Sequence, residues 1–258
     1  MTTNKTFTKT AYIPADASEF FHYYDSHPTK EDLMGESAAQ SQLIFYLLKV
    51  LEWLYQAEGW FAVSNLNIYR ERRRNEYPLA PDVAVFKGVV VPNMADRQLR
   101  SWRLYEPNRP TPQVVFEISS QETWWEDLEN KPAAYAALGV REYYAYEPND
   151  PPYWPKGGLR LRGWWLENGI MTEHQADQRG WIWSAELESW LGSDGALLRL
   201  YDRDGRMRLT EGEAQRAAKE TERAAKETER AAKETERAAK EIAWAKLREL
   251  GIDPESLG

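Results

Sequence analysis

The sequence contains no cysteine, and this absence excludes disulfide bonds, thiolate zinc sites and cysteine nucleophiles. No stretch approaches the roughly 20 apolar residues of a membrane-spanning helix, and the segment MTTNKTFTKT lacks a signal-type apolar core. The histidines His22, His27 and His174 show no metal-binding spacing, and there is no glycine-rich phosphate loop. We therefore expect a cytoplasmic protein that has no membrane partner and does not use histidine-based chemistry.

An excess of positive charge is also missing, because the formal net charge at pH 7 is -8. A nucleic-acid-binding protein usually has a basic face, so the overall charge disfavours nucleic acid as a partner. Two groups of arginines can still form a local basic surface, and both a solvated surface and a phosphate clamp stay open as interpretations. These arginines are Arg70, Arg72, Arg73 and Arg74, and then Arg97, Arg100, Arg103 and Arg109.

Length and pattern predict one sizeable α/β domain with an appendage. Apolar residues recur at helical spacing over residues 35–59, with Gly59 as the stop. Apolar segments at 60–69, 81–92, 113–120 and 140–148 predict strands, and residues 124–138 predict one helix that Gly139 closes. The order of helix, strands, helix and strand is typical of an α/β sandwich rather than of a repeated βαβ pattern.

Residues 150–210 have turn signals at Gly157-Gly158, Asn168-Gly169 and Asp204-Gly205. This pattern predicts hairpins or edge strands that cover the sheet. The tryptophans of this region favour packing over base stacking.

The sequence ETERAAK occurs three times in succession, over residues 220–240. A period of seven indicates a long helix or a coiled coil. The seam of Thr221, Ala224 and their repeats buries little, whereas Glu-before-Lys pairs four residues apart stabilise a single helix. Residues 211–258 therefore form either a solvated helix or a weak homo-oligomerisation element, distinct from a domain over residues 1–210.

Two acidic residues interrupt segments that otherwise predict buried strands: Asp82 in LAPDVAVF and Glu117 in QVVFEISS. An unpaired buried carboxylate costs several kcal/mol, so it needs a cation or a dense set of hydrogen bonds. Asp82 alone is typical of a strand's N-terminal cap. Strand alternation places Val115, Glu117 and Ser119 on one face, so Glu117 is either a water-facing edge residue or a buried ligand.

The helix that follows adds a cation to this pair. Asp127, Lys131 and Tyr135 are spaced i, i+4 and i+8, and therefore lie along one stripe. Asp127 and Lys131 can form an ordinary helical ion pair. If the stripe faces the sheet, Lys131 brings its ammonium beside Glu117, where it offsets carboxylate repulsion and polarises a phosphate or an attacking water.

The order PD, a strand ExxS, DxxxK with a tyrosine four residues later, and GVREYY resembles the Uma-two family of endonucleases, in the PD-(D/E)XK superfamily. The resemblance covers about residues 30–210, and its specific part runs from Asp82 to Tyr144. It implies an α/β, restriction-endonuclease-like fold with a mixed sheet flanked by helices, extra β-hairpins and a C-terminal helical heptad tail.

The resemblance also implies a set of site residues. Asp82 and Glu117 would bind Mg²⁺, with Mn²⁺ as a second option, and Lys131 would be the catalytic lysine. In the superfamily this lysine often stands two residues after the glutamate, where this chain has Ser119. Supporting roles fall to Ser119, Asp127, Tyr135 and, near the start of the first helix, Glu36.

These observations predict a Mg²⁺-dependent endonuclease that hydrolyses DNA phosphodiester bonds. The acidic charge and the repeat tail also support a second hypothesis, a catalytically silent binding or assembly protein that uses the nuclease fold and its helical tail. RNA stays open as an alternative substrate.

Overall fold

The computed structural model describes residues 10–11, 22–25, 27, 37–90, 99, 101–155, 159–249 and 251. The chain divides into two units, residues 1–210 and residues 211–258.

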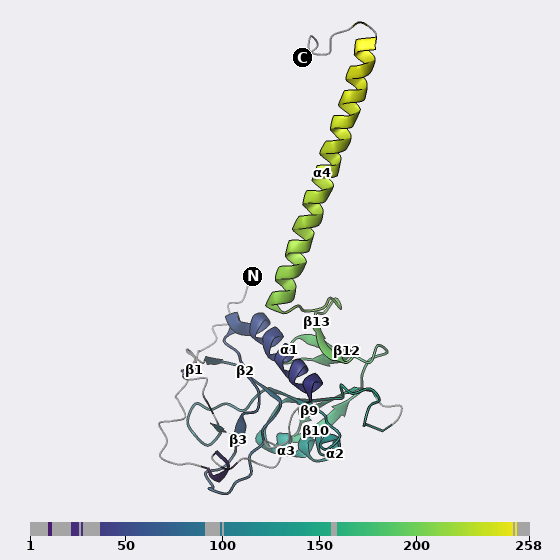
Figure 1. Ribbon diagram of the computed structural model, residues 1–258. Helices are drawn as coiled ribbons and strands as arrows, with labels where there is room; N and C mark the ends of the chain where they lie inside the picture. The colour runs from purple at the N-terminus through teal and green to yellow at the C-terminus, as the bar shows by residue number, and fades with distance from the viewer. Residues whose placement is uncertain are drawn as a thin grey trace. The chain divides into compact units, whose positions relative to one another are not determined.

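The first unit is built on a six-stranded mixed sheet with the strand order β10-β9-β8-β7-β4-β2 (Figure 1). Strands β7 and β8 are parallel, and every other neighbouring pair in this sheet is antiparallel. The strands are β2 Phe61–Val63, β4 Val83–Phe86, β7 Val114–Ile118, β8 Glu142–Tyr146, β9 Leu161–Glu167 and β10 Ile170–His174. The predicted architecture, a mixed sheet flanked by helices, is confirmed.

Helices cover both faces of this sheet (Figure 1). Helix α1 (Ala38–Tyr55) packs on one face, where Val114, Phe116 and Ile118 of β7 join its core. Helices α2 (Trp124–Glu129) and α3 (Lys131–Leu138) contribute to the core on the other face, together with Val115. The predicted alternation along β7 is therefore confirmed, and both of its faces are buried.

The single helix predicted over residues 124–138 is wrong, because the structure has two helices that meet at Asn130. Pro132 explains the break. Proline has no amide hydrogen to donate to the carbonyl four residues earlier, and its ring crowds that carbonyl. The helical end predicted at Gly139 is confirmed, since this glycine has a left-handed φ of 81°. Gly59 likewise ends the first helical segment, after a 3-10 turn (η3, Gln56–Glu58), with a φ of 69°.

Two of the predicted strands are divided. Residues 60–69 form β2 and β3 (Asn67–Tyr69), and residues 81–92 include β4 and β5 (Val89–Val90). The divisions lie at Asn65 and Gly88, whose φ angles of 49° and 73° do not fit a strand. Strand β3 pairs in parallel with β6 (Ser101–Arg103), and β5 pairs in parallel with β1 (Thr10–Ala11).

The region 150–210 contains the predicted hairpins but does not simply cover the sheet. Strands β9 and β10, joined at Asn168-Gly169, extend the central sheet to its edge. Strands β11 (Ile182–Ser184), β12 (Ser189–Asp194) and β13 (Leu197–Tyr201) form a separate sheet that packs into the α1 core. The turn predicted at Gly157-Gly158 lies outside the described residues.

The second unit contains helix α4, Glu211–Glu249, in which no residue is buried. Two of the predicted ion pairs form, with 2.5 Å between Lys226 Nζ and Glu222 Oε1 and between Lys233 Nζ and Glu229 Oε1. Lys240 lies over the ring of Trp244, 4.7 Å from its centroid. Among the described residues, no helix is both long and apolar enough to cross a membrane.

Candidate active site

Asp82 and Glu117 are brought together by the pairing of β4 with β7. Val83 pairs with Phe116, so Asp82, one residue before β4, comes level with Glu117. Asp82 Oδ2 accepts a hydrogen bond from the backbone amide of Ile118 at 2.6 Å. Glu117 is 2% exposed and Asp82 is half-buried. Two carboxylates therefore share one end of the β4–β7 pair, largely removed from water.

Lys131 places the positive charge of the site between two carboxylates. Its Nζ lies 3.1 Å from Glu117 Oε2 and 2.8 Å from Asp127 Oδ1. Lys131 is the first residue of α3, and the predicted stripe faces the sheet although the helix is broken at Asn130. The side chain of Lys131 is 17% exposed, whereas those of Glu117 and Asp127 are almost fully buried.

Buried hydroxyl groups fix the two carboxylates that contact Lys131. The hydroxyl of Tyr135 donates to Glu117 Oε1 at 2.5 Å. Ser119 Oγ and Thr123 Oγ1 donate to Asp127 Oδ2 at 2.8 and 3.1 Å. Ser119, at the position where the superfamily often has its lysine, thus anchors the aspartate that holds Lys131.

The charges of the cluster perturb one another. Burial, and next the charge of Glu117, raise the pKa of Asp82 well above its ordinary value, against the Ile118 amide. Burial also raises the pKa of Glu117, although Lys131 opposes the change. Burial would lower the pKa of Lys131, but Glu117 and Asp127 outweigh it and raise that pKa. Glu117 and Asp127 contact one ammonium and the charge of Asp82 also acts on it, so the site favours a further positive charge.

Gln40 is a site neighbour that the sequence interpretation missed. Its Nε2 donates to the carbonyl of Ile118 at 3.0 Å, while its Oε1 accepts the amide of the N-cap residue Ser37 at 2.9 Å. The amide of Gln40 donates in turn to Ser37 Oγ, which completes a capping box at the start of α1. The S-x-x-Q pattern was the available signal. Glu36, the residue that the resemblance favoured, lies outside the described residues.

The donor set at Asp82 and Glu117 fits a hard divalent cation. Within the described parts of the chain, no three or more histidine, aspartate or glutamate side chains are grouped in a way that could hold a metal ion. Mg²⁺ does not require such a group, because it commonly takes one or two carboxylates and keeps water or phosphate oxygens as its other ligands. The site has no histidine or thiolate, the ligands that zinc favours.

Two of the arginines that could form a basic surface are buried instead. Arg103 and Arg109 are buried, at 3% and 8% exposed. Arg103 pairs with Asp25 at 3.2 Å, and Glu106 pairs with both arginines, at 3.4 and 3.5 Å. The phosphate-clamp interpretation is therefore wrong for Arg103 and Arg109.

The other arginines considered for a phosphate clamp are either outside the described residues or exposed. Arg97 and Arg100 lie outside the described residues. The remaining four arginines are exposed and stay candidates for contact with a phosphate backbone: Arg70, Arg72, Arg73 and Arg74.

The chain matches a known protein family. The family model described as "Uma2: Putative restriction endonuclease" matches residues 29–189, which is more than half of the chain. The solved structure of "a putative nuclease belonging to DUF820" from Anabaena variabilis ATCC 29413 is similar, with 8% sequence identity and a TM-score of 0.40. That match covers 59% of this chain and 75% of the other. No curated protein matches the chain.

Proposed function

Because the chain belongs to the Uma2 family of restriction-endonuclease-like proteins, we propose that it is a Mg²⁺-dependent endonuclease that hydrolyses DNA phosphodiester bonds. The observation that carries the proposal is the contact of Lys131 Nζ with buried Glu117, beside Asp82. Two carboxylates at one end of the β4–β7 pair and a neighbouring ammonium are groups that suit metal-assisted phosphodiester hydrolysis.

Asp82 and Glu117 would hold the cation, with Mn²⁺ as an alternative to Mg²⁺. Bound there, the cation would polarise the scissile phosphate and lower the pKa of the attacking water. Its charge would also offset the burial and mutual repulsion that raise the pKa of both carboxyl groups. A bound cation would therefore favour the ionised forms of both groups, which are the forms that serve as ligands.

Lys131 would orient the attacking water and stabilise the negative charge that develops on the phosphate. Its ammonium is held from the protein side by Asp127, which Ser119 in turn fixes. Tyr135 holds Glu117 at the other oxygen. These contacts keep the reactive groups in one geometry before a substrate arrives, and such preorganisation is a large part of electrostatic catalysis.

The test is nicking of a supercoiled plasmid with Mg²⁺ or Mn²⁺, comparing the wild type with Asp82→Ala and Lys131→Ala. Glu126→Ala is the matched control, because Glu126 is exposed on α2 next to Asp127. We expect nicking by the wild type and by Glu126→Ala, and none by the two site variants. Equal nicking by all four proteins would indicate a contaminating nuclease and overturn the proposal.

A structured RNA substrate in the same assay separates the two phosphodiester substrates. Cleavage of RNA but not of DNA, lost in Asp82→Ala, would keep the site and replace the substrate. Absence of cleavage with both substrates would favour the catalytically silent binding or assembly protein.

A further inference from the structure

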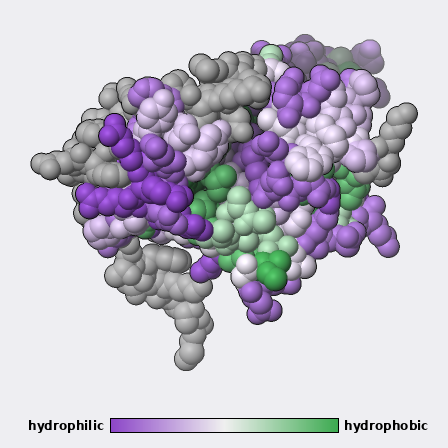
Figure 2. Space-filling view, turned by 90° about the horizontal axis from the view of Figure 1, so that it is seen from below, coloured by the Kyte–Doolittle hydropathy of each residue, from purple (hydrophilic) through white to green (hydrophobic). Residues whose placement is uncertain are grey.

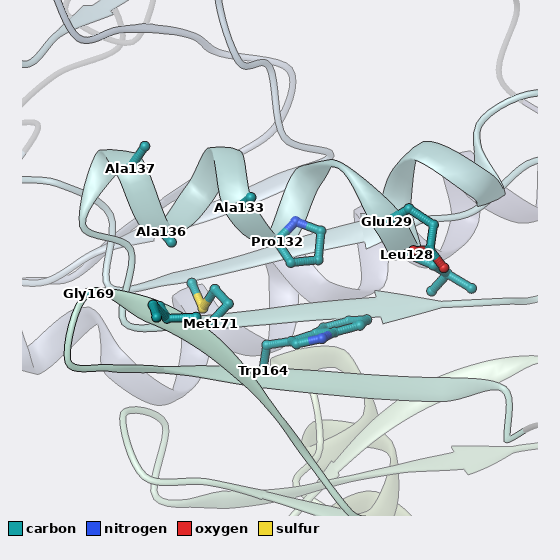
Figure 3. A pocket seen from close by; sticks show the side chains of 10 residues that line it. Leu128, Glu129, Pro132, Ala133, Ala136, Ala137, Trp164, Gly169 and Met171 are labelled. Atoms are coloured by element: carbon teal, nitrogen blue, oxygen red, sulfur yellow. The ribbon is translucent and has the colours of Figure 1, made fainter.

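The side of the catalytic unit that carries α2 and α3 has a hydrophobic area surrounded mostly by hydrophilic side chains (Figure 2). Within the described residues, a groove of about 430 Å³ lies between α2–α3 and the edge strand β10. Its lining contains a single charged residue, Glu129, and the rest is apolar or glycine. In Figure 3, Pro132 and Ala136 of α3 point toward Met171 and Trp164 on the strands below. The lining offers no cation to contact a phosphate backbone.

The groove adjoins an open sheet edge. In the described part of the chain, β10 has one neighbour in the sheet, β9. The backbone amide of Leu166 in β9 donates to the backbone carbonyl of Arg141, which lies on the β8 side of β9. Backbone amides and carbonyls alternate in direction along a strand. The backbone groups of Trp165 and Glu167 therefore face β10, and those of Met171 and Glu173 face away from β9. Strand β10 contains neither lysine nor proline, the residues that commonly protect an edge from pairing.

We propose that this edge and groove form a twofold interface with a second copy of the chain. Antiparallel pairing of β10 with its own copy, centred on Thr172, would extend the sheet across the interface. The twofold axis would be perpendicular to the sheet, so both α3 helices would lie on the same face. The exposed alanines Ala133 and Ala137 allow the two helices to approach closely, and the paired copies would cover both grooves.

The charges of the edge permit this pairing. Glu173 is already paired with Arg162, whose Nε and Nη2 each donate to it at 2.6 Å. In the proposed register Glu173 lies opposite Met171 of the second copy, so no like charges face each other directly. Ile170, at 70% exposed, is the most exposed of the large hydrophobic residues in the described regions and also lines the groove. Burying it would contribute to the association.

The size of the surface indicates a weak dimer. Five residues of β10 extend about 17 Å, and the helix layer lies about 10 Å from the sheet. The footprint is therefore about 17 by 10 Å, or roughly 170 Å² per copy, well below the roughly 800 Å² per partner of a standard interface. Dimerisation should appear only as the protein concentration rises, and the free monomer should be soluble.

Sedimentation velocity of the full chain over a wide concentration range tests the proposal. Ala133→Lys and Ala137→Lys place like charges across the twofold axis on exposed helical positions, and Ala225→Lys in α4 is the matched control. We expect concentration-dependent dimers of the wild type and of the control, and monomers of both groove variants with unchanged circular dichroism. A wild type that is monomeric throughout, or dimers lost only in the α4 variant, would overturn the proposal.

Hydrogen exchange provides a readout that needs no variant. Exchange at the amides of Met171 and Glu173 should slow as the wild-type protein is concentrated, because these amides would become paired. Rates that do not change with concentration, in a sample that sediments as a dimer, would place the interface elsewhere and overturn the proposal.

Discussion

Replacing Lys131 by methionine removes the one ammonium of the ion-pair cluster while keeping most of the side-chain volume. Glu117 and Asp127, 3% and 1% exposed in their side chains, would be left without that partner. Removing one member of a buried ion pair typically costs about 3–5 kcal/mol. Here we expect about 3 kcal/mol for the metal-free protein at pH 7, because the 17% exposure of Lys131 already reduces the strength of the pair.

The pH dependence identifies the cause of this loss. In the variant, the folded-state pKa of Glu117 lies further above its unfolded value, so the folded state binds a proton more tightly. Once the pH falls below that folded-state pKa, each further unit, down to the unfolded value, should recover up to about 1.4 kcal/mol. The difference from wild type should therefore be largest at neutral pH and shrink in acid.

Urea unfolding in EDTA, followed by tryptophan fluorescence at pH 7 and pH 5, measures both effects. Adding Glu117→Gln to Lys131→Met should recover part of the loss, since the uncompensated charge is gone. A Lys131→Met protein as stable as wild type at pH 7, within about 0.5 kcal/mol, would refute the reasoning that this lysine neutralises the cluster.

Three further predictions concern the same site. Tyr135→Phe removes the donor to Glu117 Oε1 and should cost about 1–3 kcal/mol in urea unfolding, with weaker metal binding by calorimetry; an unchanged affinity would show that this hydroxyl does not position the carboxylate. Burial and Glu117 raise the pKa of Asp82, so the metal-free protein should lose stability as pH rises through that pKa, and Asp82→Asn should flatten the profile of Tm against pH. A variant profile as steep as that of the wild type would assign the titration to another group. Gln40→Ala removes both the capping-box contact and the hydrogen bond to the Ile118 carbonyl of β7, and should lower the free energy of unfolding by about 1–2 kcal/mol. Gln42 is exposed on the same helix, so Gln42→Ala should be nearly neutral in the same urea titration.

The meeting of Lys131 with Glu117 could be predicted from the sequence because it depends on two local periodicities. Alternation along β7 and the four-residue spacing of the helix determine which faces Glu117 and Lys131 occupy. The break at Asn130 follows from Pro132, but helical periodicity alone does not indicate it, because the apolar and charged spacing continues across the break.

Other features depend on contacts between distant parts of the chain. Gln40 and Ile118 are 78 residues apart, and so are Arg103 and Asp25. No periodicity links such pairs, so the arginines resembled a basic loop and the glutamine resembled a simple helix cap. That β9 and β10 extend the sheet, rather than cover it, likewise depends on the pairing of β8 with β9.

Because β7 is buried on both faces, the position of Glu117 depends on the exact number of residues in this strand. Inserting or deleting one residue within Val114–Ile118 would turn Glu117 toward the apolar layer beneath α1 and push Phe116 or Ile118 toward Lys131. The proposed metal-binding carboxylate therefore cannot move along its strand by single-residue steps. Substitutions can modify this site, but insertions and deletions in β7 would destroy it together with the fold.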